Sequence, residues 1–253
     1  MSVSPLSVYV LTHNSEKYLS QILAAVLGVA DDLLVVDSGS QDRTVEIARA
    51  NGARVLFRPF DDFRQQRLFA QQNCEHEFVF FLDSDEIPSA ELLTAIRGMK
   101  QEGFQHDAYV IQRDWIVLGR QVHAMYPVGC PDYPIRIINK NRVTLSEQAV
   151  HEDFIGYRSR GCLNLPIQHH TFHSMEELQI KLQRYTDLDA FDIARFNNKK
   201  YLALRQWTSP LGAFLKWYIR SANWKDGWVG LQLGLYAARY THLKYRKALQ
   251  LSQ

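Results

Sequence analysis

Residues 78–86 read FVFFLDSDE, five apolar residues followed by three carboxylates within four positions. The apolar run predicts a buried strand, and such a strand brings its last residues to the carboxyl edge of a sheet, where open α/β folds bind ligands. Asp83 and Asp85 are two residues apart, so on a continuing strand both would point to one face. Two carboxylates on one face suit Mg²⁺ or Mn²⁺, with phosphate oxygens completing the shell. The alternative is an acidic turn in which Ser84 or Asp85 caps a helix opened by Pro88.

The rest of the first hundred residues alternates between strand and helix signals. Strands are predicted at residues 6–11, 33–36, 55–57 and 78–82, and helices at 18–27, 42–50, 64–74 and 90–99. Short apolar strands separated by helices of about 10 residues predict a mostly parallel sheet covered on both faces. The fold class is therefore α/β.

The pattern changes after residue 107. Further strands are predicted at 108–113, 135–138 and 142–145, and the chain becomes helical from Ser174, a good N-cap. Apolar residues recur at helical spacing between Leu211 and Ala222 and predict one apolar helix face. We expect an α/β domain over residues 1–173 and a helical extension over 174–253.

Composition is that of a globular protein, with 46% hydrophobic and 22% charged residues among 253. The first residues lack a signal-peptide pattern, and no run of about 18 apolar residues predicts a membrane-spanning helix. The three cysteines, Cys74, Cys130 and Cys162, fit neither a disulfide framework nor a zinc pattern. These features predict reduced thiols in a cytoplasmic protein.

Charge is distributed unevenly along the chain. Residues 1–173 carry 16 Lys and Arg against 21 Asp and Glu, a net of −5, whereas residues 174–253 carry 13 against 6, a net of +7. The C-terminal extension is therefore expected to face an anionic partner.

Two other predicted strands also end in polar residues. The strand predicted at residues 6–11 is followed by Thr12-His13-Asn14. The strand predicted at residues 33–36 is followed by Asp37, whose carboxylate can accept hydrogen bonds from a nucleobase N–H or from ribose hydroxyls. The alternative is a turn in which Ser40 or Asp42 caps the next helix. Capping does not account for Asp37.

Three blocks together carry a resemblance: THN at 12–14, VDSGSQDRT at 36–44 and LDSDE at 82–86. Their residues and spacing resemble the family 2 inverting glycosyltransferases of GT-A fold. The resemblance implies a UDP-sugar donor, with Asp37 at the uracil or ribose and Asp83 and Asp85 at the ribose and the metal-bound diphosphate. The remaining donor-binding residues that it implies are Thr12, Asn14, Ser38, Ser84, Arg67 and Gln71.

Motifs in the second half of the chain point to one subfamily of these glycosyltransferases. The stretches VHED at 150–153, LPIQHHTF at 165–172 and DGWVG at 226–230 resemble bacterial lipopolysaccharide core glucosyltransferases, which add β-glucose to an inner-core heptose. This likeness implies a lipopolysaccharide acceptor at the inner face of the cytoplasmic membrane. Related enzymes with similar motifs act on capsule, lipid-carrier or peptide acceptors. A non-catalytic protein that binds nucleotide sugars is a further alternative. Transfer of a nucleotide to a sugar phosphate is not expected, because that reaction needs a glycine-rich phosphate-binding loop near the first strand and the sequence there has none.

An inverting transfer needs one base to take the acceptor hydroxyl's proton. The candidates are Glu152 and Asp153, and adjacent residues on extended chain point oppositely, so one of them should face the anomeric carbon. The subfamily pattern favours Glu152, while many other family 2 members use the Asp of such a pair. The same pattern makes His169 a metal ligand beside Asp85. The alternatives are a surface acidic turn and a packed histidine.

Two arginines, Arg113 and Arg136, could pair with phosphate. They could equally lie on solvated strand faces, which is the preferred interpretation for Arg113. In the extension, four tryptophans stand among basic residues, a combination that suits the lipid headgroup layer: Trp207, Trp217, Trp224 and Trp228. The alternative is burial of these aromatics against the first domain or a second subunit. Nucleic acid is not an expected partner, because no recognised module accompanies the charge.

Overall fold

The computed structural model describes residues 3–146 and 153–252. These form two compact units, one of Met1–Arg113 with Tyr133–His169 and the other of Asp114–Asp132 with His170–Gln253. The first unit contains the acidic strand end, and the second contains the basic, aromatic-rich helices.

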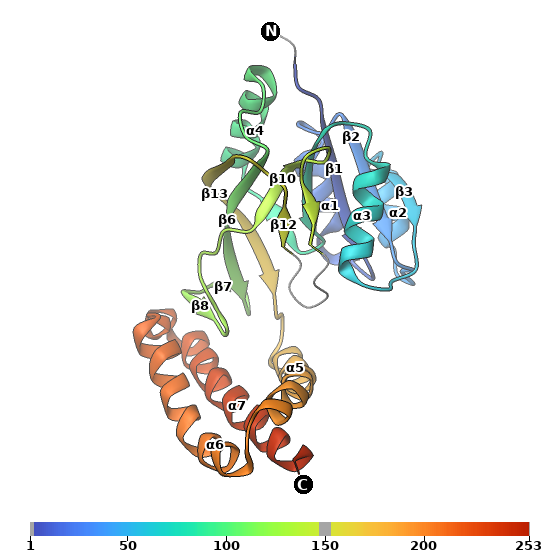
Figure 1. Ribbon diagram of the computed structural model, residues 1–253. Coiled ribbons are helices and arrows are strands. Elements are labelled where there is room, and N and C mark those ends of the chain that lie inside the picture. Colours follow the sequence, from blue (N-terminus) through green and yellow to red (C-terminus); the bar gives the residue numbers. More distant parts are fainter. Residues whose placement is uncertain (1–2, 147–152, 253) are drawn as a thin grey trace. The chain divides into compact units, whose positions relative to one another are not determined.

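The first unit is built on a twisted sheet with the strand order β3-β2-β1-β4-β10-β6-β13-β5 (Figure 1). Its parallel strands are β1 (Leu6–Thr12), β2 (Asp32–Asp37), β3 (Arg54–Phe57) and β4 (Phe78–Asp83). The remaining strands are β5 (Glu86–Pro88), β6 (Ala108–Val117), β10 (Ile135–Asn139) and β13 (Arg160–Thr171). Strand β10 runs antiparallel to β4 and β6, and β13 runs antiparallel to β5. The predicted α/β class is confirmed.

Helices cover both faces of this sheet, because its strands are apolar on both sides. Leu6, Val8 and Val10 of β1 pack in one core with α1 (Glu16–Val26), α2 (Thr44–Ala50) and α4 (Ala90–Glu102). Tyr9 of the same strand points to the opposite core, with α3 (Phe63–Asn73). The alternation of side chains along β1 thus divides the core in two.

The turn after β4 differs from the helix-capping alternative. Pro88 lies in β5, whose Ile87 pairs with Gln168 of β13, and α4 begins only after Ser89. The Ser89 hydroxyl accepts the hydrogen bond from the N–H of Leu92 at 3.2 Å. The acidic residues therefore lead into a strand, and capping does not explain them.

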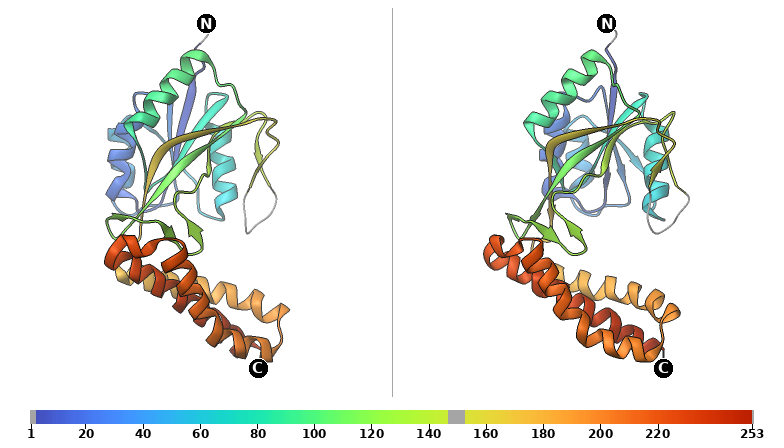
Figure 2. Two further views of the ribbon diagram at one scale, coloured as in Figure 1. Left: turned by 90° about the vertical axis from the view of Figure 1, so that its left-hand side faces the viewer. Right: turned by 60° about the vertical axis from the view of Figure 1, so that its left-hand side comes forward.

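The second unit contains three helices that lie side by side (Figure 2). They are α5 (Met175–Phe196), α6 (Lys199–Phe214) and α7 (Gly227–Leu251), and α6 continues into the π-helical turn η1 (Leu215–Arg220) and the 3₁₀ turn η2 (Asn223–Asp226). Short strands complete the two units: β7 (Arg120–Gln121), β8 (Ala124–Met125), β9 (Val128–Gly129), β11 (Thr144–Leu145) and β12 (Phe154–Ile155). As predicted, Ser174 caps α5, accepting from the N–H of Glu177 at 3.1 Å.

The predicted apolar helix face between Leu211 and Ala222 is only partly correct. The α-helix ends at Phe214, and Ala222 has a φ of +61°, so regular helical spacing does not extend over the whole stretch. Leu211 and Ile219 are exposed rather than packed in a core. Trp217, one of the four tryptophans expected to face lipid, is instead buried and packs with Ala124 and Ala213. In the part of the chain that the structure describes, no helix is apolar over enough residues to cross a bilayer.

Candidate active site

Three strand ends meet at the carboxyl edge of the parallel sheet. Strand β1 lies between β2 and β4, and its register pairs Thr12 with Asp37 on one side and Leu11 with Asp83 on the other. Asp37 and Asp83 are therefore one strand apart on either side of the end of β1. The sequence-based expectation that these residues share an edge is met by this register.

The Asp37 carboxylate is buried and accepts four hydrogen bonds. Its Oδ1 accepts from the hydroxyls of Thr12 and Ser40, and its Oδ2 accepts from the backbone N–H groups of Gly39 and Ser40, both at 2.9 Å. Burial by itself would raise the pKa of Asp37, but the bonds from Ser40, Gly39 and Thr12 outweigh it and lower the pKa. Asp37 is consequently a fixed anion at neutral pH.

The neighbouring predicted residues brace the loops around Asp37. Asn14, with a φ of +50°, donates its N–H to the Ser40 hydroxyl at 2.8 Å and accepts from the N–H of Gln41 at 2.8 Å. The N–H of Ser38 donates to the carbonyl of Thr12 at 3.0 Å. These bonds tie the loop after β1 to the loop after β2.

Asp83 lies between two guanidinium groups. Arg67 of α3 donates to its Oδ1 and Arg136 of β10 donates to its Oδ2, each at 3.1 Å. Although burial opposes ionisation, the charges of Arg67 and Arg136 hold the pKa of Asp83 well below its usual range. Asp83 is thus charge-compensated by the protein itself.

The same cluster contains a fully buried carboxylate, Glu86, which the sequence analysis did not single out for a role. Arg136 donates to it through Nε at 2.8 Å and Nη2 at 2.6 Å, and Arg113 donates through Nη1 at 3.0 Å. The N–H of Asp83 adds a fourth bond at 3.2 Å. The preferred interpretation of Arg113 as a solvated residue is therefore wrong, because Arg113 is largely buried against Glu86.

Asp85 has a different partner from Asp83. Its Oδ2 lies 3.3 Å from Nε2 of His169, and the Asp85 side chain is 35% exposed. The pairing of β5 with β13 places His169 opposite Glu86, which explains how a residue 84 positions later reaches the acidic turn. The structure thus brings together the two residues predicted to bind a metal.

This pair has the chemistry of a partial divalent-cation site. A carboxylate oxygen and an imidazole nitrogen are both ligands for such ions, and Mg²⁺ commonly takes only one or two protein carboxylates besides phosphates and water. Within residues 3–146 and 153–252, no group of three or more His, Cys, Asp and Glu side chains is arranged to hold a metal. The donor set therefore fits a cation that the substrate helps to bind.

The remaining described residues predicted to bind the donor or to act as the base lie in different parts of the first unit. The Ser84 hydroxyl accepts from the Ser15 hydroxyl at 2.9 Å, while Gln71 is buried on α3, one turn after Arg67. Asp153 is exposed just before β12, and its N–H donates to the Ser146 hydroxyl at 3.1 Å. Glu152 lies outside the described residues.

Comparison with known proteins decides the family. A family model described as "Glycosyl transferase family 2" matches residues 7–158, which is more than half of the chain and includes all three strand ends. The chain belongs to glycosyl transferase family 2. It is a glycosyltransferase, and its α/β fold is the GT-A fold implied by the sequence motifs.

Similar proteins include two bacterial relatives. An uncharacterized glycosyltransferase of Rickettsia typhi is 28% identical over 98% of this chain and 87% of its own length. The lipopolysaccharide core biosynthesis glycosyltransferase LpsC of Rhizobium meliloti is 26% identical over 97% of this chain and 92% of its own. Among solved structures, residues 1–349 of TarS from S. aureus align with a TM-score of 0.47 and 17% identity, over 98% of this chain and 90% of that one.

We expect the substitution Glu86→Gln to lower the free energy of unfolding by about 3 kcal/mol, because it removes the buried charge that compensates Arg136 and Arg113. Glu91→Gln, an exposed carboxylate in the first turn of α4, is the matched control and should change it by less than about 0.5 kcal/mol. Urea unfolding measures both values. Equal stabilities of the two variants would contradict a structural role for Glu86.

Proposed function

We propose that this glycosyltransferase moves a hexose, glucose in the first instance, from a UDP-sugar to an inner-core acceptor of lipopolysaccharide. The observation that carries the proposal is the convergence of Asp37, Asp83 and the Asp85–His169 pair at one edge of the sheet. The likeness to LpsC along almost the whole chain supports the choice of acceptor.

In this proposal Asp37 recognises the nucleoside. Because all four of its lone-pair directions already accept hydrogen bonds, a nucleobase N–H or a ribose hydroxyl must replace one of them. The Ser40 hydroxyl is the easiest to displace, since it can rotate while its backbone N–H keeps its bond. Ser40 would then release Asp37 when the donor binds. Thr12, Asn14, Ser38 and Ser84 keep the surrounding loops in place.

Asp85 and His169 would hold Mg²⁺ or Mn²⁺ together with the donor diphosphate. Such an ion supplies compensation for the negative charge that develops on the departing UDP. Asp83 has a separate task, because Arg67 and Arg136 already compensate its charge. It would accept a ribose hydroxyl while fixing the two guanidinium groups beside the diphosphate. Gln71, behind Arg67, would support this arrangement from within the core.

The inverting step requires a base on the acceptor side of the sugar. Glu152 is the proposed base, and Asp153 is the alternative. Deprotonation of the acceptor hydroxyl by this carboxylate accompanies attack on the anomeric carbon, the bond to UDP breaks, and the new linkage has the opposite configuration.

Turnover tests the proposal. Purified protein with UDP-glucose, Mn²⁺ and lipopolysaccharide truncated in the inner core should release UDP and form a β-linked product, detected by a coupled UDP assay and by NMR. Asp85→Ala should reduce release at least about 100-fold, because the ion loses a charged ligand, and Glu91→Gln should leave it unchanged. Capsule, lipid-carrier and peptide acceptors form the comparison panel. UDP binding without turnover on any acceptor would instead indicate a non-catalytic binder.

The base is identified by comparing Glu152→Gln with Asp153→Asn. The variant that removes the base should lose about 100-fold or more in kcat while its KM for the donor changes little, because general-base catalysis contributes mainly to the chemical step. We expect this result for Glu152→Gln. Full activity in both variants would remove this pair from the mechanism.

We further propose that the second unit, here called the C-terminal unit, rests on the cytoplasmic face of the membrane that carries the acceptor. An apolar strip, here called the α6 strip, follows α6 and η1. It consists of Leu204, Trp207, Leu211, Leu215 and Ile219, which are between 45% and 72% exposed. Lys199 and Lys200 precede the strip, and Lys216 and Arg220 flank its end. Exposed apolar and basic side chains on one helical element suit an anionic lipid surface.

Paired substitutions test the membrane contact. Leu211→Gln with Ile219→Gln should reduce partitioning onto anionic vesicles roughly tenfold, because two side chains no longer transfer into the lipid. Leu188→Gln with Phe191→Gln removes equally exposed apolar residues from α5 and should have little effect. Sedimentation with vesicles measures both. Unchanged partitioning of the α6 variant would exclude the α6 strip as the contact.

A further inference from the structure

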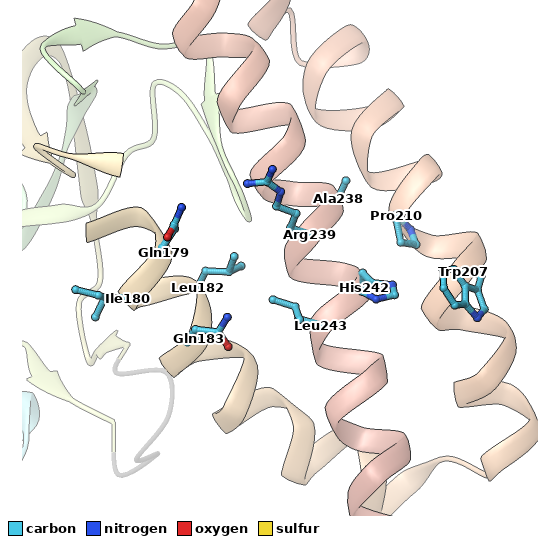
Figure 3. Close-up of a pocket in the computed structure, with 10 residues that line it drawn as sticks. All are labelled: Gln179, Ile180, Leu182, Gln183, Trp207, Pro210, Ala238, Arg239, His242 and Leu243. Carbon is cyan, nitrogen blue, oxygen red and sulfur yellow. The ribbon is translucent and has the colours of Figure 1, made fainter. Parts of the chain in front are cut away.

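A groove of about 760 Å³ runs along α7 within the C-terminal unit. Figure 3 shows α7 between α5 and α6, with Leu182 supplied by α5, Trp207 and Pro210 by α6, and Arg239, His242 and Leu243 by α7. Its volume is in the range of small-molecule sites, and most of these side chains are apolar. The groove thus combines an apolar channel with one permanent cation, Arg239.

Arg239 differs from the two lysines of α7. Lys244 lies 3.8 Å from Asp189 and Lys247 lies 2.7 Å from Asp187, so the carboxylates of α5 compensate the C-terminal half of the helix. Among the described side chains no ion pair involves Arg239, which is exposed. The positive charge at this position is therefore available to a ligand.

His242 is held in place beside Arg239. Its Nδ1 lies 2.8 Å from the carbonyl oxygen of Gln206, and its ring packs 5.2 Å from that of Trp207. A carbonyl only accepts, so Nδ1 carries the proton and Nε2 is left for other contacts. The polar part of the groove is thus pre-organised.

The charge of the unit decides what the groove can bind. Residues 174–253 carry a net of +7, so the same segment of a second copy would bring like charge to this surface. An anionic occupant is favoured instead, and the apolar walls require that it also carry a hydrocarbon chain. Trp207 belongs both to the groove and to the α6 strip, which makes the groove continuous with the surface proposed to meet the membrane.

We propose that this groove binds one anionic phospholipid. An acyl chain lies between Leu182, Leu243 and Pro210, and the phosphate pairs with Arg239 beside His242. The inference deepens the proposed membrane contact and rests on it for the supply of lipid. It does not depend on glycosyl transfer, because every residue of the groove belongs to the C-terminal unit.

Calorimetry with the full chain and dihexanoyl phosphatidylglycerol, kept below its micelle concentration, tests the groove without a membrane. We expect saturable binding of one lipid per chain. Arg239→Gln should weaken it roughly three- to tenfold, because a charge-assisted bond to phosphate is lost. Arg246→Gln removes the same charge two turns further along α7, outside the groove, and should change affinity less than about twofold. Ala238→Phe, which fills the groove, should abolish binding.

Two further ligands show whether the binding heat comes from the phosphate group alone or from the whole anionic lipid. Inorganic phosphate alone should not bind measurably, and dihexanoyl phosphatidylcholine should bind more weakly than the anionic lipid. Absence of saturable lipid binding would overturn the inference, as would equal losses in Arg239→Gln and Arg246→Gln or phosphate binding as tight as lipid binding. The circular dichroism spectrum and the thermal unfolding of each variant show whether the chain is folded. Vesicle sedimentation of Ala238→Phe shows separately whether the membrane contact survives when the groove is filled.

Discussion

One buried guanidinium organises the acidic edge of this glycosyltransferase. Arg136 bonds both to Asp83 at the end of β4 and to the buried Glu86 three residues later. It is a cation that both carboxylates share, whereas Arg67 bonds to Asp83 and Arg113 to Glu86. Because Arg136 belongs to β10, which runs antiparallel to β4, the mixed part of the sheet stabilises the acidic turn that follows its parallel part.

As a result, carboxylates that look alike in the sequence have different partners in the structure. Asp83 and Glu86 bind arginines, whereas Asp85 lies next to His169 and is partly exposed. On the other side of β1, Asp37 is held as an anion by hydroxyl and backbone N–H donors rather than by a cation. The edge therefore offers three carboxylate environments: one bound by arginines, one beside a histidine and suited to a cation, and one held by hydrogen-bond donors and suited to recognition of a nucleoside.

Local sequence patterns predicted the parallel half well, because burial on both faces makes strands such as Val35–Val36 and Phe80–Leu82 unmistakably apolar. The meeting of Asp85 with His169 was predicted by resemblance, but its cause, the pairing of β5 with β13, joins segments about 80 residues apart and leaves no local signal. The same pairing places Pro88 in a strand, which rules out the alternative in which Pro88 opens a helix. Arg113 was misjudged for a related reason, since an arginine on a strand gives no sign of a buried partner elsewhere in the chain. The boundary between an α/β domain and a helical extension at residues 173 and 174 stays a prediction, as does the choice of Glu152 over Asp153 as the catalytic base.

Asp85, which is not bound to any arginine among the described residues, is the residue proposed to hold the cation that fixes the donor diphosphate. Calorimetric titration of UDP with Mn²⁺, compared with the same titration in chelator, tests this role most directly. Mn²⁺ should strengthen UDP binding to the native protein and have little effect on Asp85→Ala, whose affinity for UDP should match that of the native protein in chelator. Mn²⁺-dependent UDP binding of equal strength in Asp85→Ala and the native protein would contradict the account.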